Sequence, residues 1–463
     1  MLASLFLLSS AAQGAAYYFS DIGVRAYSRG GAFVAGADDL TALYYNPAAM
    51  TRLRGFTTTL SVAGVGEDIM FDRADYPGEG PLVDGENEDI VNEPITNAAP
   101  AYMIPHFGIS GNFGLPNTTI ALGFYPPYAP DVAYPKNGPQ RYSLVDTLVI
   151  QTFAGVSAAH KFADWVSIGG GVSWNVLIVE QELMAYVAPE TITNEDPQYD
   201  VYFGVRAQDN YALTWNAGIL IEPPTKQWAI GASYQPPITF DGKGNMYADF
   251  TESFWYENGL VTSGRPEDKD VTIDVTMPPI LRTGALVRPN EDMEIEFAYV
   301  WQGWSNLESL TVRDINLPIE TSISDEPTMV EDDIVLPTGF VNAHSYRLGF
   351  QYDVIDSATI RVGGNYETSA VQPQNLAPNM VDTNKFGVGF GGSYHFDMGL
   401  SLDFGLSQVF YENITVTDSD VRQIGVDPLS GDIYEGRVIA DGRYTSRLNL
   451  LGGGFTYNFQ PKN

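Results

Sequence analysis

The side chains best suited to catalysis are few and scattered in this sequence. No two histidines have the spacing of a metal-binding motif such as H-E-x-x-H; the four are His106, His160, His344 and His395. Ser393 and His395 alternate onto one face of a predicted strand, but no Gly-x-Ser-x-Gly turn or placed acid completes a hydrolase triad. The chain has no cysteine, which excludes Cys-ligated zinc and disulfides. We therefore expect no enzyme, no catalytic residue, no metal site and no cofactor.

Acidic side chains dominate the charge. The 57 Asp and Glu outnumber the 24 Lys and Arg, and the formal net charge is -33. This balance argues against nucleic acid as a partner, because phosphates are bound by clusters of Lys and Arg. Acidic residues crowd 67–93 and 325–333. Dense like charges usually form a hydrated surface, and the alternative is a divalent cation held by carboxylate oxygens.

Residues 1–16 have the pattern of an export signal. An apolar stretch over 2–8 precedes small residues over 9–16 that resemble a cleavage site, although no positive charge comes first. Elsewhere no apolar run approaches the ~20 residues that a membrane-spanning helix needs. If the chain spans a membrane, strands must do it.

Alternation with a period of two runs through the rest of the chain. Apolar residues alternate with small or polar ones in five clear segments, which are 166–178, 228–234, 293–301, 386–396 and 400–406. Such alternation indicates strands with one apolar face.

The connections between these strands are of two kinds. Short turns occur at 161–164, 224–226, 289–292, 355–357 and 397–399. Long polar connections occur at 66–96, 181–208, 239–270, 306–339 and 415–442. Short turns at one end and long loops at the other are typical of an outer-membrane barrel. A closed barrel also gives every backbone N–H and C=O in lipid a hydrogen-bond partner. We expect an all-β fold, a transmembrane antiparallel barrel of about fourteen strands over 55–459, each near the ~9–11 residues that a tilted strand needs.

A short helical segment precedes the first strand. Asp38 or Asp39 can cap a helix that runs to Tyr45, and Asn46 can cap a second helix with Pro47 at its first position. Glycines before it permit bending and close approach to other backbone; they are Gly23, Gly30, Gly31 and Gly36.

Four blocks carry a family resemblance. They are Gly30-Gly31-Ala32 through Asp38-Asp39 to Asn46-Pro47-Ala48, then Arg141-Tyr142 followed by 166–169, then Met277-Pro278-Pro279 leading to 301–305, and finally 358–363. With these blocks in this order, the chain resembles FadL-type outer-membrane transporters of long-chain fatty acids and other hydrophobic molecules. The resemblance implies a Gram-negative outer-membrane protein in contact with lipid and lipopolysaccharide, which we expect to be a monomer. It also implies an N-terminal hatch over 17–54 inside the barrel and a tail at 460–463.

Two sites follow from the resemblance. The hatch residues are Asp38, Asp39, Asn46, Pro47 and Ala48, which either move to let ligand pass or only form a rigid turn. An inward kink of the third strand would open the barrel wall at Gly123, Phe124, Tyr125, Pro126 and Pro127. The alternative is that this strand ends at Tyr125 and the prolines begin a loop, because proline cannot donate to a ladder.

The loops and the lumen supply further candidates. We expect apolar side chains exposed on the external loops to capture ligand first; they are Leu183, Met184, Val187, Phe250, Phe254, Trp255, Tyr256 and Leu260. Arginines on predicted strands are candidate partners for a carboxylate head group; they are Arg282, Arg288, Arg347, Arg361 and Arg447. The alternative is that they pair with the lumen acids Glu294, Glu296 and Asp403.

The sequence thus predicts passive uptake of fatty acids or aromatic hydrocarbons, with capture by the loops, passage by the hatch and sideways release at the kink. Two alternatives remain open, a general aqueous porin and a barrel that acts as a secretion or assembly partner.

Overall fold

A computed structural model describes residues 21–53, 55–128 and 131–459. The predicted signal peptide at 1–16 and the predicted tail at 460–463 lie outside these residues. No helix in the described part is long and apolar enough to cross a membrane.

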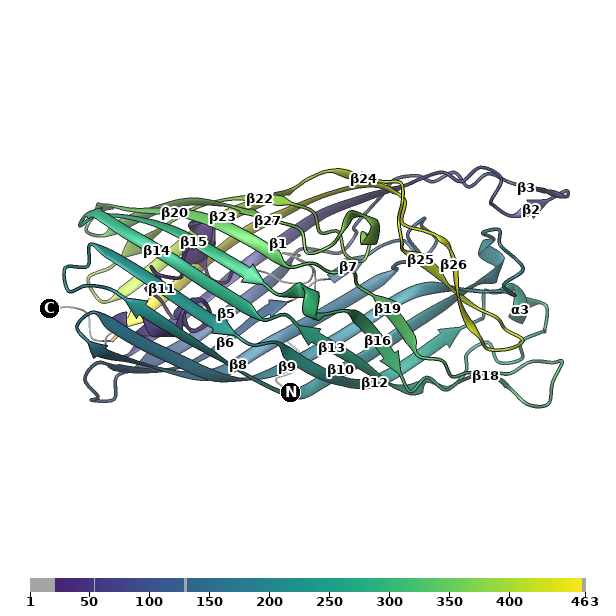
Figure 1. Cartoon of the computed structure of the whole chain (residues 1–463), viewed down its shortest axis with the longest axis horizontal. Coiled ribbons are helices and arrows are strands. Elements are labelled where there is room, and N and C mark those ends of the chain that lie inside the picture. Colours follow the sequence, from purple (N-terminus) through teal and green to yellow (C-terminus); the bar gives the residue numbers. More distant parts are fainter. Residues whose placement is uncertain (1–20, 54, 129–130, 460–463) are drawn as a thin grey trace.

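The described chain forms a closed 14-strand antiparallel barrel (Figure 1). Its spanning strands are β1 (Thr57–Arg73), β5 (Tyr102–Gly111), β6 (Thr118–Tyr128), β8 (Asp146–Ala163), β9 (Val166–Val187), β10 (Asp200–Ile221), β11 (Trp228–Gln235) with β12 (Ile238–Asp249), β13 (Lys269–Met277) with β14 (Ile280–Asn290), β15 (Met293–Gln302), β20 (Ala343–Ile355), β21 (Ala358–Glu367), β22 (Lys385–His395), β23 (Leu400–Tyr411) and β27 (Gly442–Asn458). β1 pairs with β27 along its whole length and closes the barrel.

The predicted alternation decides which side chains face lipid. On β22, Phe386 and Phe390 are half exposed on the outer surface, while the intervening Gly387 and Gly389 are buried toward the lumen. The same pattern recurs on β23. Because these rings would be exposed to water in a soluble protein, the outer surface of the barrel suits a hydrocarbon environment.

The two ends of the barrel differ as the sequence predicts. One end carries the short turns and the helices near the N-terminus, and the other carries the long connections (Figure 1). Small elements in these connections are β2 (Leu82–Val83), β3 (Glu86–Asn87), β4 (Ile95–Thr96), β7 (Asp131–Ala133), η2 (Pro197–Tyr199), α3 (Phe254–Glu257), η3 (Trp304–Asn306), β16 (Ser309–Arg313), β17 (Leu317–Ile319), β18 (Thr328–Val330), β19 (Ile334–Pro337), η4 (Pro373–Asn375), β24 (Ile414–Val416), β25 (Arg422–Val426) and β26 (Ile433–Val438).

Several of these connections are shorter than predicted. β9 continues to Val187 and β10 already begins at Asp200, so much of 181–208 is strand. β12 likewise continues to Asp249. Beyond the membrane the outward side chains are polar, so the apolar alternation that reveals a lipid-facing strand disappears while the backbone ladder continues.

Candidate functional site

The lumen at the short-turn end is filled by residues 21–53, the hatch. It contains α1 (Val24–Ser28), α2 (Ala42–Tyr45) and η1 (Pro47–Arg52), which lie inside the barrel (Figure 1). Phe33 and Val34 are fully buried. Gly30 has a positive φ of 60°, and a side chain there would collide with the backbone of Gly364 on β21. The hatch therefore packs tightly against the wall, as its glycines predict.

The acidic residues of the hatch act differently from the prediction. Thr41, not Asp38 or Asp39, is the N-cap residue of α2, and it makes no side-chain capping bond. Asp39 Oδ1 instead accepts from Thr41 N at 2.8 Å and so fixes the turn before the helix. Asp38 Oδ1 accepts from Arg25 NH1 at 3.3 Å. The predicted helix cap is wrong because the helix begins later than the acidic pair suggests.

Asn46 has the predicted capping role. Its Oδ1 accepts from Ala48 N at 3.1 Å, and Pro47 occupies the first turn of η1. Its Nδ2 also donates to Val34 O at 3.1 Å and to Ile219 O of β10 at 3.0 Å. One fully buried side chain thus joins two hatch segments to the barrel wall.

We expect Asn46→Ala to loosen this corner. The change removes the cap, which is typically worth ~1 kcal/mol, and leaves the buried Val34 carbonyl without the Asn46 donor. Faster hydrogen exchange at the Ala48 amide would measure the loss. Asn46→Asp is the matched variant, because it keeps the capping oxygen and loses both donated bonds. Wild-type exchange in both variants would contradict this role.

Glu296 of β15 holds the backbone of the hatch, a role that the sequence did not reveal, because it suggested Glu296 only as a partner for lumen arginines. Its Oε1 accepts from Val34 N and Ala35 N, each at 2.7 Å, and its Oε2 accepts from Gly36 N at 3.0 Å. Oε2 also lies 3.3 Å from Arg29 NH2. The Glu296 side chain is fully buried, so an apolar wall residue here would leave three backbone donors without these bonds.

Further ion pairs join hatch and wall. Arg25 Nε donates to Asp403 Oδ1 of β23 at 2.9 Å. Arg347, a predicted head-group partner, pairs with Asp21 of the hatch and lies 3.6 Å from Glu367. The charge of Arg347 in the lumen is therefore already compensated by a carboxylate of the hatch and one of the wall.

The other inward arginines are also engaged within the protein. Arg288 Nε donates to Glu294 at 2.7 Å. Arg361 Nε donates to Gln351 at 2.8 Å. The Arg282 guanidinium lies 4.2 Å from the centre of the Tyr44 ring in the hatch.

The lumen placement predicted for Arg447 is wrong. It points outward between the buried Ser446 and Leu448, with its guanidinium 5.5 Å from the ring centre of the outward-facing Phe410. The long alternating run of β27 contains small residues on both faces, so the sequence did not fix which face is the inner one.

An apolar cavity of about 100 Å³ lies in the lumen toward the long-loop end. It is bounded by Val149, Val179, Gln181, Leu183, Ala185, Phe203, Gly204, Val205, Met246, Ile273, Val275, Met277, Leu310, Val312, Val330, Ile334, Ile424, Val426 and Ile433. None of these residues is charged. A wider mouth of about 730 Å³ shares Leu183, Leu310 and Ile334 with it, and so adjoins it.

The third spanning strand is irregular at its prolines. β6 does not end at Tyr125 but continues to Tyr128, with a shift of register against β8 between Tyr125 and Tyr128. Its ladder with β5 stops at the pair Phe107 and Phe124. β5 continues to pair with β1 as far as Tyr102, so β5 and β6 separate in their halves nearer the long loops. Whether ligand passes there stays a prediction.

Comparison with known proteins fixes the family. Residues 2–459 match the family of outer membrane protein transport proteins, OMPP1/FadL/TodX. The chain belongs to this FadL/TodX family. It is accordingly an outer-membrane β-barrel of a transport family rather than an enzyme.

Individual relatives of this FadL/TodX-family chain are distant. It is 22% identical over 431 residues to a long-chain fatty acid transport protein of Escherichia coli O6:H1, covering 87% of each chain. The match to the protein of that name from Escherichia coli K12 is 24% identical over 215 residues, 45% of this chain and 44% of the relative, so it spans less than half of that relative.

Solved structures extend the likeness over the whole barrel. A Pseudomonas aeruginosa FadL homologue has a TM-score of 0.76 at 18% identity, with 96% of this chain and 100% of that chain covered. The Pseudomonas putida toluene transporter TodX has a TM-score of 0.66 at 15% identity, with 96% and 100% covered. These likenesses establish a common fold.

The apolar loop residues of this FadL/TodX-family chain are less exposed than predicted. Phe250 and Val187 are fully buried in one cluster, against which Trp255 packs. Trp255 Nε1 donates to Val187 O at 2.6 Å. Met184 lies in a different buried cluster, with Tyr142. The expectation of a bare capture surface is therefore wrong for Phe250, Val187 and Met184.

The remaining predicted capture residues lie nearer the surface. Phe254 packs its ring 5.4 Å from that of Trp255, Tyr256 is exposed and Leu260 is half-buried. Leu183 lines the apolar cavity itself.

A buried ionic cluster ties three external segments together. Arg141 donates to Asp200 at 2.6 Å and to Glu195 at 2.9 Å, and Arg73 donates to Glu195 at 2.8 Å. Burial raises the pKa of the Glu195 carboxyl, but hydrogen bonds and charges from Arg73 and Arg141 outweigh it and hold that pKa below its usual value. The charged cluster fixes the loops around the mouth.

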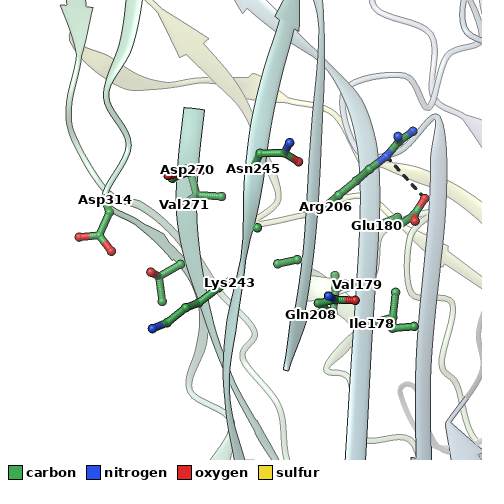
Figure 2. A pocket seen from close by; sticks show the side chains of 13 residues that line it. Ile178, Val179, Glu180, Arg206, Gln208, Lys243, Asn245, Asp270, Val271 and Asp314 are labelled. Carbon is green, nitrogen blue, oxygen red and sulfur yellow. Dashed lines mark ion pairs between the residues drawn. The ribbon is translucent and has the colours of Figure 1, made fainter. Parts of the chain in front are cut away.

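A polar hollow of about 720 Å³ lies where β9, β10, β12 and β13 run side by side (Figure 2). Figure 2 shows Arg206 and Glu180 pointing toward one another, with Nε and Oε2 3.6 Å apart. Lys243 and Asp270 also line it. Within the described residues no group of three or more acidic or histidine side chains could hold a metal ion.

Proposed function

We propose that the protein carries hydrophobic molecules across the outer membrane without an energy source. Ligand enters at the mouth between the long loops, occupies the apolar cavity, passes the hatch and leaves sideways between β5 and β6. The observation that carries this proposal is the apolar cavity, because no charged side chain lines it and the hatch lies beyond it.

The hydrophobic effect can drive the first steps. Burial of each CH₂ group is worth roughly 0.8 kcal/mol, so an apolar pocket extracts a hydrocarbon from water. The mouth adjoins the cavity through Leu183 and Leu310, so the ligand need not return to water between them.

The sideways exit is supported by the ladder between β5 and β6. Pro126 and Pro127 have no backbone N–H, and the register against β8 shifts beside them. Among the described residues no ladder rung joins these two strands past Phe124, and this break is the exit to lipid that we propose.

The charges favour uncharged ligands over fatty acid anions. The mouth is lined by Asp332, Asp333, Asp420 and Glu435 against Arg422. Negative charge that lines the entrance lowers the local concentration of an anion there. Further in, Arg288, Arg347 and Arg361 already bind partners in the protein.

Uptake of a matched pair of molecules tests this proposal. Cells that lack their own transporter of this family would express the protein and receive labelled dodecanol or dodecanoate at neutral pH. We expect expression to increase dodecanol uptake more than dodecanoate uptake. Equal stimulation would overturn the charge preference, and a large steady conductance by the intact protein would overturn transport in favour of an aqueous porin.

The same assay tests the exit. Pro126→Ala/Pro127→Ala restores two backbone donors and is expected to reduce dodecanol uptake. Pro223→Ala/Pro224→Ala, in a short turn remote from β6, is the matched control. Unchanged uptake in the first variant would contradict release beside β6.

A further inference from the structure

The barrel wall has a second place where neighbouring strands do not pair. β10 pairs with β12 as far as Gln208 and Lys243, and it pairs with β11 from Ala217 and Tyr234 onward. Between these rungs lie residues 209–216 of β10 and 235–242 of β11 and β12, which we call the seam. No ladder rung joins its two sides among the described residues. Asp241 N donates to Asp209 Oδ2 across it at 3.1 Å.

Both sides of the seam are irregular in a matched way. On β10 the register against β9 shifts between Asp209 and Ala212. On the other side, Pro236 and Pro237 interrupt the strand between β11 and β12. The prolines remove two donors from an edge that would otherwise need partners in lipid. Two irregularities that face each other keep this stretch of wall unpaired.

Neighbouring interruptions carry backbone-to-backbone hydrogen bonds, whereas the bond from Asp241 N across the seam ends on the Asp209 side chain. At Pro278–Pro279 of the next strand, Gly303 N donates to Pro279 O at 2.9 Å. Farther along the wall, Thr338 N donates to Glu308 O at 3.1 Å. A break in a strand therefore does not by itself leave an opening in this barrel.

The seam lies in the outer-leaflet half of the membrane. β10 reaches the short-turn end at Ile221, and a tilted spanning strand needs ~9–11 residues, so Tyr211 marks roughly the other surface of the hydrocarbon. Large apolar side chains point outward around the seam, with Leu213 70% exposed and Trp215 48% exposed. The Trp215 and Tyr234 rings are 6.0 Å apart. The outer rim is thus suited to lipid.

The hatch closes the inner side of the seam. Asn216 Nδ2 of β10 donates to Leu43 O at 2.7 Å, and Ser233 Oγ of β11 donates to Tyr45 O at 2.6 Å. Hatch residues are therefore bound to both strands beside the seam. A cavity of about 20 Å³ lies behind it, and its lining includes Leu43, Thr214, Asn216, Gln235, Gly123 and Tyr125.

This cavity connects the two irregular parts of the wall. Gly123 and Tyr125 belong to β6, whereas Thr214 and Gln235 belong to the seam. Its volume has room for about one water molecule, so it is closed as it stands. Displacement of Leu43 would enlarge it toward both sides.

We propose that the seam is a second lateral portal, through which an uncharged hydrophobic molecule enters the outer leaflet when Leu43 moves away. The portal rests on the proposed transport function and adds a route on a different side of the barrel from β5 and β6. It would let one hatch movement serve two exits.

Cross-linking can close each route separately, because the chain has no native cysteine. Asn216→Cys/Gln235→Cys places two thiols on opposite sides of the seam, next to the Ala217–Tyr234 rung at which the seam ends. His106→Cys/Tyr125→Cys does the same where β5 and β6 separate. Thr59→Cys/Thr456→Cys is the control, because these hydroxyls face each other at 3.0 Å on a fully paired part of the wall. Each pair is closed with dibromobimane, and uptake of the uncharged probe N-phenyl-1-naphthylamine by expressing cells is measured.

We expect either cross-link alone to leave part of the uptake, and the two together to abolish it. The same variants without cross-linker serve as their own controls for the substitutions. The portal would be overturned if the β5–β6 cross-link alone abolished uptake, or if adding the seam cross-link to it changed nothing. Absence of uptake by the unmodified protein would instead overturn the transport function, and the portal with it.

Discussion

Glu296→Ala is expected to convert the plugged barrel into a leaky pore. The substitution removes the acceptor of three backbone N–H groups, from Val34, Ala35 and Gly36. Hydrogen bonds to a charged group are worth ~1.5–3 kcal/mol each, and a buried charge that loses its partner costs ~3–5 kcal/mol. Arg29 retains Glu294 at 3.1 Å, so part of its charge stays compensated. A loss of several kcal/mol should displace the hatch around residue 35.

Conductance of the purified barrel in planar bilayers measures this change. Glu294→Ala is the matched control on the same strand, because Glu294 pairs with the Arg29 and Arg288 side chains and, among the described residues, accepts no hydrogen bond from the hatch backbone. A difference in gel mobility between heated and unheated samples of each variant would establish that both barrels are folded. Wild-type conductance in Glu296→Ala would show that the other attachments suffice to hold the hatch.

Val275→Trp is expected to abolish transport while leaving the barrel intact. Val275 points inward from β13 into the apolar cavity of about 100 Å³. The larger ring adds volume comparable with that void, and a well-packed interior has no other room for it. Ligand that enters at the mouth would then find no apolar space before the hatch.

The neighbouring Thr276→Trp is the control for this prediction. Thr276 follows on the same strand and faces outward. Uptake of dodecanol by expressing cells should fall at least tenfold in Val275→Trp, which corresponds to a barrier to passage higher by about 1.4 kcal/mol or more, and stay near wild type in Thr276→Trp. Equal uptake in the two variants would place the ligand path elsewhere.

The spanning strands could be predicted because lipid and lumen impose opposite demands on successive residues. The run from Phe386 to Phe390 shows this contrast directly. Local rules also predicted the corner at Asn46 and Pro47, since a cap and a first-turn proline depend only on neighbouring positions. Outside the membrane the contrast vanishes, and the end of β9 at Val187 was therefore missed.

Long-range pairing was the part that the sequence could not supply. Glu296 differs from other inward acids because residues 34–36 lie against it. No local pattern in either segment indicates that the two segments are in contact. Arg447 was misplaced for a related reason, since a shift of one residue exchanges the two faces of a strand. Phe250 was expected on the surface because no local pattern marks the cluster that covers it.

The attachment of the hatch also constrains the order in which the protein is assembled. Arg25 and its partner Asp403 are separated by 378 residues, and Val34 and Glu296 by 262. The hatch is synthesised before β15 and β23, so its charged side chains are neutralised only after those strands are in place. Contacts this distant along a chain form late, since the intervening loop must close first. Because β1 directly follows the hatch and pairs with β27 along its whole length, closure of the barrel also brings the hatch to the lumen that holds its partners on β15 and β23.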